Sequence, residues 1–120
     1  MLRRVKRLED DGAIVGYRAV IDPSALGINL QALILVQLSE HSRTSLAEFE
    51  AVLTPIPAVR ACFHVTGRFD MVLVIAARDL HHLAELIRYD IAKVPRVAKL
   101  ETMLLLTAVK PDGGWPGLPN

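Results

Sequence analysis

Two stretches of the chain are apolar at nearly every position, and two others mix apolar with polar residues. The apolar stretches are Leu33–Leu38 and Met71–Ala77, and their pattern predicts strands that are buried on both faces. Val59–Thr66 alternates instead, which predicts a strand with two unlike faces. Val59, Ala61, Phe63 and Val65 are expected on one of these faces, and Arg60, Cys62, His64 and Thr66 on the other. A last strand is predicted at Val97–Leu106.

Two amphipathic segments between these strands predict helices. Ser45-Leu46-Ala47-Glu48 is a capping box, in which the side chains of Ser45 and Glu48 satisfy free backbone amides at a helix start. The buried stripe of this helix is expected to be Leu46, Phe49 and Leu53. Asp79 suits the cap of a second helix, which ends before Pro95. Its buried face is expected to hold Leu80, Leu83, Ala84, Ile87 and Ile91.

The predicted order from residue 33 is strand, helix, strand, strand, helix, strand, the ferredoxin-like βαββαβ arrangement of an α+β protein. This fold has an antiparallel sheet whose first and third strands are central. The pattern agrees, because the two wholly apolar strands are the first and third, while Arg60 and Glu101 lie in the second and fourth. Both helices cover one face of such a sheet, so the apolar residues of the other face need a cover. We therefore expect a homodimer.

Residues 1–11 predict a helix with a basic surface. Leu2, Val5 and Leu8 repeat at helical spacing, and Gly12 suits a left-handed cap. The cations of this helix are Arg3, Arg4, Lys6 and Arg7. Clustered cations either form a solvated helix surface or contact phosphate groups. Residues 16–21 then predict a short strand, and residues 22–23 a turn.

Composition narrows the class of protein. Of the 120 residues, 52% are hydrophobic, which is high for one small domain and again favours self-association. A formal net charge of +1 argues against nucleic-acid binding through a broad basic face. The single cysteine, Cys62, excludes an internal disulfide framework and fits a reducing compartment. No apolar run approaches the roughly 20 residues that span a bilayer, and no signal-peptide core follows Met1, so we expect a soluble, cytoplasmic protein.

The connection between the second and third strands, Thr66-Gly67-Arg68-Phe69-Asp70, carries groups that suit a free amino acid. Backbone amides and the Thr66 hydroxyl can bind a carboxylate, and Gly67 lets a ligand approach the backbone closely. Asp70 either binds an ammonium group or braces the loop from within. The same residues also suit a plain hairpin in which Gly67 only relieves backbone strain.

Other reactive residues predict no further site. The histidines are His41, His64, His81 and His82. With Cys62 and Asp79 they lack the spacing of a metal site, so neither a metal nor another cofactor is expected. His64 is expected on a half-polar strand face near the dimer contact. No nucleophile–base–acid set or phosphate-binding glycine loop is recognisable, and an enzyme is not expected. Trp115 suggests a docking contact at most.

Three segments resemble the Lrp/AsnC, or feast/famine, family of transcription regulators. They are Arg4–Gly12 with Ile14, Gly16 and Tyr17 behind it, Val65–Asp70, and Leu100-Glu101-Thr102. The resemblance implies an effector-binding RAM domain with the ferredoxin-like fold, assembled as dimers and then as rings such as an octamer. The effector, commonly an amino acid, would bind between dimers beside the loop. The expected contacts are Thr66, Gly67, Arg68, Asp70 and Thr102.

Under this resemblance the chain has four parts. Residues 1–15 resemble the end of a helix-turn-helix, residues 16–29 a linker strand and hinge, residues 30–110 the RAM domain, and residues 111–120 a flexible tail. The implied DNA contacts are Arg3, Arg4, Lys6 and Arg7. A complete helix-turn-helix has two further helices, which these 120 residues do not include. DNA binding is therefore expected of the full-length form, and weak, sequence-independent binding of this chain.

The sequence thus predicts an amino-acid-responsive transcription regulator, represented mainly by its sensing and oligomerisation domain. Two other functions remain open. A stand-alone effector-binding module would oligomerise without serving DNA. A ferredoxin-like dimeric oxygenase would depend on His64, although a shared fold alone does not support that transfer.

Overall fold

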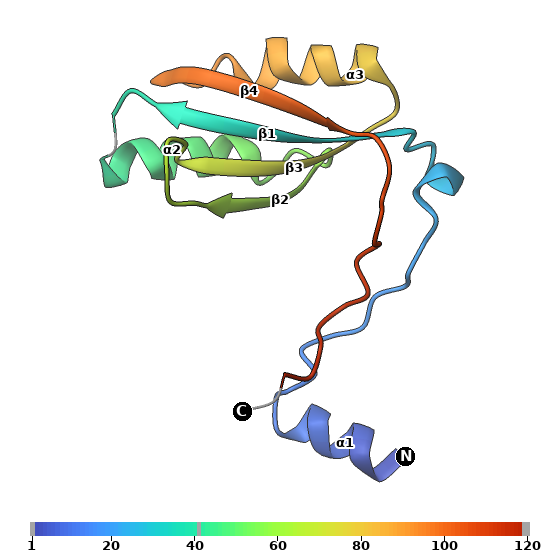
Figure 1. The fold of residues 1–120 in the computed structure, drawn as a ribbon. Helices are drawn as coiled ribbons and strands as arrows, with labels where there is room; N and C mark the ends of the chain where they lie inside the picture. The colour runs from blue at the N-terminus through green and yellow to red at the C-terminus, as the bar shows by residue number, and fades with distance from the viewer. Residues whose placement is uncertain (1, 41, 119–120) are drawn as a thin grey trace.

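A single antiparallel sheet with two helices on one face forms the body of the protein (Figure 1). The computed structural model describes residues 2–40 and 42–118. Within these residues the strands are β1 (Leu30–Leu38), β2 (Val59–His64), β3 (Met71–Ala77) and β4 (Val97–Leu105). Their order across the sheet is β2-β3-β1-β4. The two most apolar strands are therefore central, as the pattern predicts.

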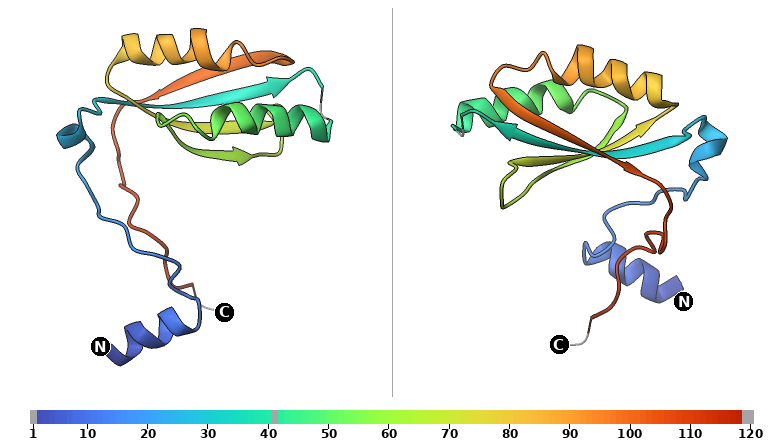
Figure 2. Two further views of the ribbon diagram at one scale, coloured as in Figure 1. Left: turned by 180° about the vertical axis from the view of Figure 1, so that it is seen from behind. Right: turned by 45° about the horizontal axis from the view of Figure 1, so that its top comes forward.

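Helix α2 (Arg43–Leu53) and helix α3 (Leu80–Glu85), which continues as a π-helical segment η2 (Leu86–Ile91), cover the same face of the sheet (Figure 2). Phe49 and Leu53 of α2 are fully buried between the helices and the sheet. The strands contribute alternate residues to this core, namely Ala32, Ile34, Val36, Leu38, Met71, Leu73 and Ile75. The ferredoxin-like βαββαβ prediction is confirmed.

Helix α2 starts earlier than the predicted capping box. Its N-cap is Ser42, whose side chain accepts a hydrogen bond from the Ser45 amide at 3.1 Å. Ser45 is 4% exposed and its hydroxyl lies 2.8 Å from that of Ser42. Glu48 does not close a box with Ser45 but accepts a hydrogen bond from Arg96. The capping prediction was therefore wrong by three residues, because an equally good cap stands one turn upstream.

The second helix confirms its Asp79 cap but buries a different stripe. Asp79 accepts a hydrogen bond from the His82 amide at 2.8 Å. Leu80 is 59% exposed and Ala84 is also exposed, contrary to the prediction. The π-helical segment that follows winds with i→i+5 bonds, which turns both Leu86 and Ile91, five residues apart, toward the sheet. The residues buried from this region are Leu83, Leu86, Ile91 and Val94.

Strand β2 contains an irregularity that moves Val59 off the face it was expected to share with Ala61 and Phe63. Its register with β3 shifts between Val59 and Ala61. Beyond the shift, Cys62 pairs with the buried Leu73, so Cys62 and His64 lie on the helix side of the sheet. Phe63 lies on the open face and is 57% exposed. The prediction that Val59 and Phe63 share a face was wrong, because the bulge adds one residue to the alternation.

The N-terminal part stands away from the sheet (Figure 1). Helix α1 (Leu2–Asp10) buries none of its residues, and Gly12 closes it with φ +78°, as predicted. The predicted turn at residues 22–23 becomes a short helix, η1 (Pro23–Leu26), capped by Asp22. The strand expected at residues 16–21 is not formed, because this segment is extended and exposed but has no strand beside it to complete a ladder within the described chain.

Candidate functional site

The hairpin from Thr66 to Asp70 joins β2 to β3 at one end of the sheet. Gly67 adopts φ +109°, a backbone conformation that side-chain-bearing residues rarely take. The hairpin is closed by the Val65 amide, which donates to the Asp70 carbonyl at 3.0 Å. The Asp70 amide in turn donates to the Val36 carbonyl of β1 at 2.8 Å. These bonds fix the base of the loop on the central strand.

The carboxylate of Asp70 holds the end of the central strand. It accepts a hydrogen bond from the Leu38 amide at 2.7 Å, in a partly buried position. Leu38 is 2% exposed, so its amide has little access to water as an alternative partner. The geometry therefore supports the bracing role that the sequence left as one of two possibilities.

The tip of the hairpin presents backbone amides to its surroundings. Among the described residues, the amides of Thr66, Gly67, Arg68 and Phe69 donate to no partner. Thr66, Gly67 and Arg68 are also exposed. Unpartnered backbone amides and a guanidinium are groups that can bind an anion such as a carboxylate.

Phe69 of the loop also lies near Lys99 on the edge strand β4, a residue that was not predicted to be part of the site. The ammonium group of Lys99 on β4 lies 5.9 Å from the centre of the Phe69 ring. This approach brings a second cation to the loop. Only the packing of β1 between β3 and β4 creates it, so no local sequence signal could have revealed it.

Thr102 lies apart from the other predicted contacts. It pairs with Ile34 in the middle of β1, whereas the hairpin packs at the end of that strand near Val36 and Leu38. The structure therefore brings together Thr66, Gly67, Arg68 and Asp70, but not Thr102, within one chain.

A second cluster at the same end of the sheet involves Arg96, which the sequence reading also missed. Its guanidinium lies 2.8 Å from the Glu40 carboxylate and 2.6 Å from that of Glu48. Its carbonyl accepts a hydrogen bond from the Ser39 amide at 2.7 Å. Arg96 has φ +71°, which only a constrained site holds in a non-glycine residue. The cluster ties the end of β1 to α2 and to the start of β4.

The basic helix α1 presents its four predicted DNA-contacting residues to solvent. The exposed cations are Arg3, Arg4, Lys6 and Arg7. The Tyr17 hydroxyl donates a hydrogen bond to Glu9 at 2.7 Å, which ties the following segment back to the helix. This bond is the main reason that the pKa of the Tyr17 phenol is raised.

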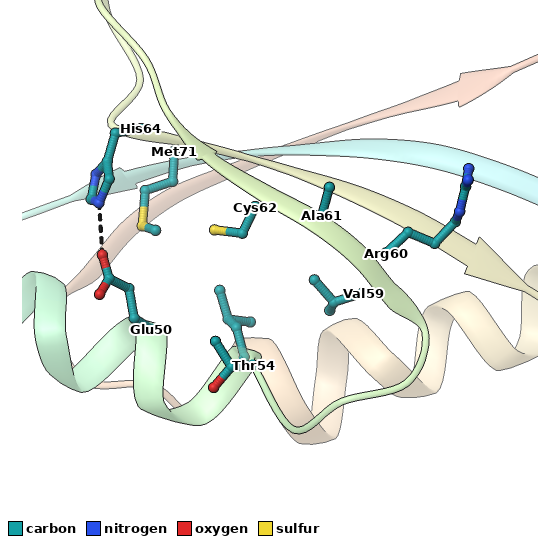
Figure 3. Close-up of a pocket in the computed structure, with 9 residues that line it drawn as sticks. Glu50, Thr54, Val59, Arg60, Ala61, Cys62, His64 and Met71 are labelled. Atoms are coloured by element: carbon teal, nitrogen blue, oxygen red, sulfur yellow. Dashed lines mark hydrogen bonds and ion pairs between the residues drawn. The ribbon is translucent and has the colours of Figure 1, made fainter. Parts of the chain in front are cut away.

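His64 points into a cleft between β2 and α2, not toward the open face (Figure 3). Its Nε2 atom lies 2.7 Å from Oε1 of Glu50. The register shift between Val59 and Ala61 places His64 on the helix side of the sheet, and its expected position near a dimer contact stays a prediction. Burial, and then the nearby Glu50 carboxylate, raise the pKa of the Cys62 thiol in the same cleft.

The other histidines form separate local contacts. His82 accepts a hydrogen bond from the Arg78 amide, and His81 lies 2.9 Å from Glu85 one turn along α3. His41 lies outside the described residues. In the described part of the chain no group of three or more potential metal ligands occurs, and no helix has the length and apolarity to cross a membrane.

Several known transcription regulators are similar to this chain. Residues 31–115 match the Lrp/AsnC ligand binding domain. The leucine-responsive regulatory protein of Rhizobium meliloti is 36% identical over 91% of this chain and 70% of its own length. The proline dehydrogenase transcriptional activator of Rhizobium radiobacter is 33% identical over 92% of this chain and 70% of its own. A transcriptional regulator from Neisseria meningitidis, solved in complex with L-Met, superposes with a TM-score of 0.88 at 27% identity, covering 96% of this chain and 74% of that one.

Proposed function

Because this chain belongs to the Lrp/AsnC family of transcription regulators and contains the family's ligand-binding domain, we propose that it senses an amino acid through the Thr66–Asp70 hairpin. The observation that carries the proposal is the run of unpartnered amides from Thr66 to Phe69. A ligand carboxylate can accept hydrogen bonds from these amides with little rearrangement of the loop, since its base is already fixed.

Each predicted residue has a distinct part in this proposal. The amides of Gly67 and Arg68, with the Thr66 hydroxyl, bind the carboxylate, and the Arg68 guanidinium adds positive charge. Asp70 acts on the ligand only through the loop, because its carboxylate is engaged with the Leu38 amide. Thr102 takes part only if a neighbouring copy brings it to the hairpin, since it lies away from the loop in its own chain.

The face of the sheet that the helices leave open supports a dimer as the form that binds the amino acid. Leu33 pairs with Val74 on β3 and with Met103 on β4, which places all three on this face. Phe63 and Met103 are 57% and 49% exposed. A contiguous apolar face of this kind marks an interface in soluble proteins. Larger rings would form from such dimers.

In the complete regulator, binding of the amino acid would then change how the protein binds DNA and so regulate transcription. The cations of α1 can bind phosphate groups, and phosphate contacts position a protein without reading the base sequence. Selective binding would come from the complete regulator in its full-length form. We assign no turnover to the hairpin, which offers donors to an anion but presents no nucleophile with a neighbouring base.

Calorimetric titration with the common amino acids tests the proposal, beginning with L-methionine. The parent chain should bind at least one of them, and Gly67→Val should weaken that binding about tenfold or more, because the added side chain obstructs the amides. Gly114→Val is the matched control, since Gly114 has a similar φ of +84° but lies in the C-terminal segment. Equal binding by the parent and Gly67→Val, both folded by circular dichroism, would place the site elsewhere.

A further inference from the structure

The cleft between β2 and α2 is lined by more than the His64–Glu50 pair. Its volume is about 310 Å³, at the small end of the range of about 300–1,000 Å³ typical of ligand pockets. Leu53 and Met71 are buried at its floor, and Cys62 and Val59 are partly buried beside them. Figure 3 shows the sulfur atoms of Cys62 and Met71 directed into the cleft. The floor therefore offers a narrow, polarisable, apolar surface to an unbranched chain.

The polar rim of the cleft is rich in hydrogen-bond acceptors. Glu50 uses Oε1 for His64, and its Oε2 atom has no partner among the described residues. Thr54, the C-cap residue of the same helix, also lines the cleft. Arg60 also lines the cleft, but its guanidinium is directed away from Glu50 in Figure 3 and donates a hydrogen bond to Gln31 at 3.5 Å. A ligand that fits this rim carries hydrogen-bond donors and a positive charge.

We propose that the cleft binds a small molecule with an ammonium group at the end of an unbranched apolar chain. The ammonium group donates to Glu50, and the chain packs against Leu53, Cys62 and Met71. Apolar α-amino acids and simple aliphatic amines share this chemistry, since an α-carboxylate can remain in solvent at the rim. The proposal does not depend on the hairpin, whose amides select a carboxylate instead.

The single cysteine provides a direct measure of occupancy. A molecule in the cleft covers the Cys62 thiol, so it slows alkylation by iodoacetamide, followed by intact mass at pH 8 in phosphate buffer. The probes are L-methionine, 3-(methylthio)propylamine, which lacks the carboxylate, and 4-(methylthio)butanoic acid, which lacks the amine. We expect the first two to slow alkylation at millimolar concentration and the acid to have no effect.

Substitution of Glu50 tests whether this residue is responsible for the protection of Cys62 by the amine. Glu50→Gln should raise the concentration of amine needed for half protection about tenfold, because a charge-assisted hydrogen bond is lost. For each variant, the alkylation rate with ligand is divided by the rate without ligand. A substitution that changes the reactivity of Cys62 by itself therefore does not affect the comparison. Glu85→Gln is the matched control, since Glu85 also pairs with a histidine on a helix but lies outside the cleft. Gly67→Val should leave protection by the amine unchanged, which separates this site from the hairpin.

Three results would overturn the proposal. Equal protection by the amine and the acid would show that Glu50 does not select the ligand, and no protection by any probe would show that the cleft binds none of them. Protection that rises with protein concentration in the absence of a ligand would show that a second copy covers the cleft.

Discussion

Replacing Asp70 with alanine tests the most specific bond in the hairpin. The substitution removes the carboxylate that accepts from the Leu38 amide at 2.7 Å and leaves that amide without its partner. Because Leu38 is 2% exposed, water cannot readily take the place of the carboxylate. A hydrogen bond to a charged group is worth about 1.5–3 kcal/mol, and we expect the lower half of this range because Asp70 is only partly buried.

Urea denaturation at fixed protein concentration measures this loss. With a denaturant slope of about 1–3 kcal/mol/M for a small protein, a loss of about 2 kcal/mol lowers the midpoint by about 1 M. Asp70→Asn should lose about 1 kcal/mol or less, because the amide oxygen still accepts from the Leu38 amide. Asp112→Ala is the control, since Asp112 accepts from the Gly114 amide at 2.9 Å in the exposed C-terminal segment. If Asp70→Ala unfolds at the same urea concentration as the parent, the bracing role is refuted.

Three further predictions concern other parts of the molecule. The parent chain should be a dimer in light scattering behind a sizing column and the double variant Phe63→Glu, Met103→Glu a monomer, whereas a monomeric parent would contradict the proposed open-face interface. Burial and the Glu50 carboxylate raise the pKa of Cys62, so the folded chain has less thiolate at pH 8 than the chain unfolded in urea. Alkylation of the folded chain should therefore be slower, and the pH at which its rate is half-maximal should be higher. Equal rates would contradict this. Arg96→Gly should change the free energy of unfolding by less than about 1 kcal/mol, because relief of the positive φ offsets two exposed ion pairs. A loss of several kcal/mol in urea denaturation would show that those ion pairs dominate.

The sequence predicts the fold well because burial leaves a local periodicity. The apolar runs of β1 and β3 identify the central strands without any knowledge of their partners. The details that failed depend on competition between nearby alternatives. Ser42 and Ser45 are both good caps, and one inserted residue in β2 reverses the sides on which Cys62 and Phe63 lie.

The candidate site was predictable only where it is continuous in sequence. The residues of the Thr66–Asp70 hairpin follow one another in the sequence, so their pattern and the resemblance to the Lrp/AsnC family predicted this loop as the site. Membership of the family is confirmed. The Leu38 amide, Lys99 and Arg96 reach the same end of the sheet from distant positions. Their arrival depends on strand order and register, which no short pattern encodes.

Hydrogen–deuterium exchange with and without an amino acid tests the central claim most directly, because it reports on the backbone amides themselves. The effector found by calorimetry is added at saturation, and exchange is compared peptide by peptide. We predict slower exchange in the peptide that covers residues 66–69, whose amides have no partner within the described chain. Unchanged exchange there, with protection confined to other peptides, would contradict the claim that the hairpin binds the effector.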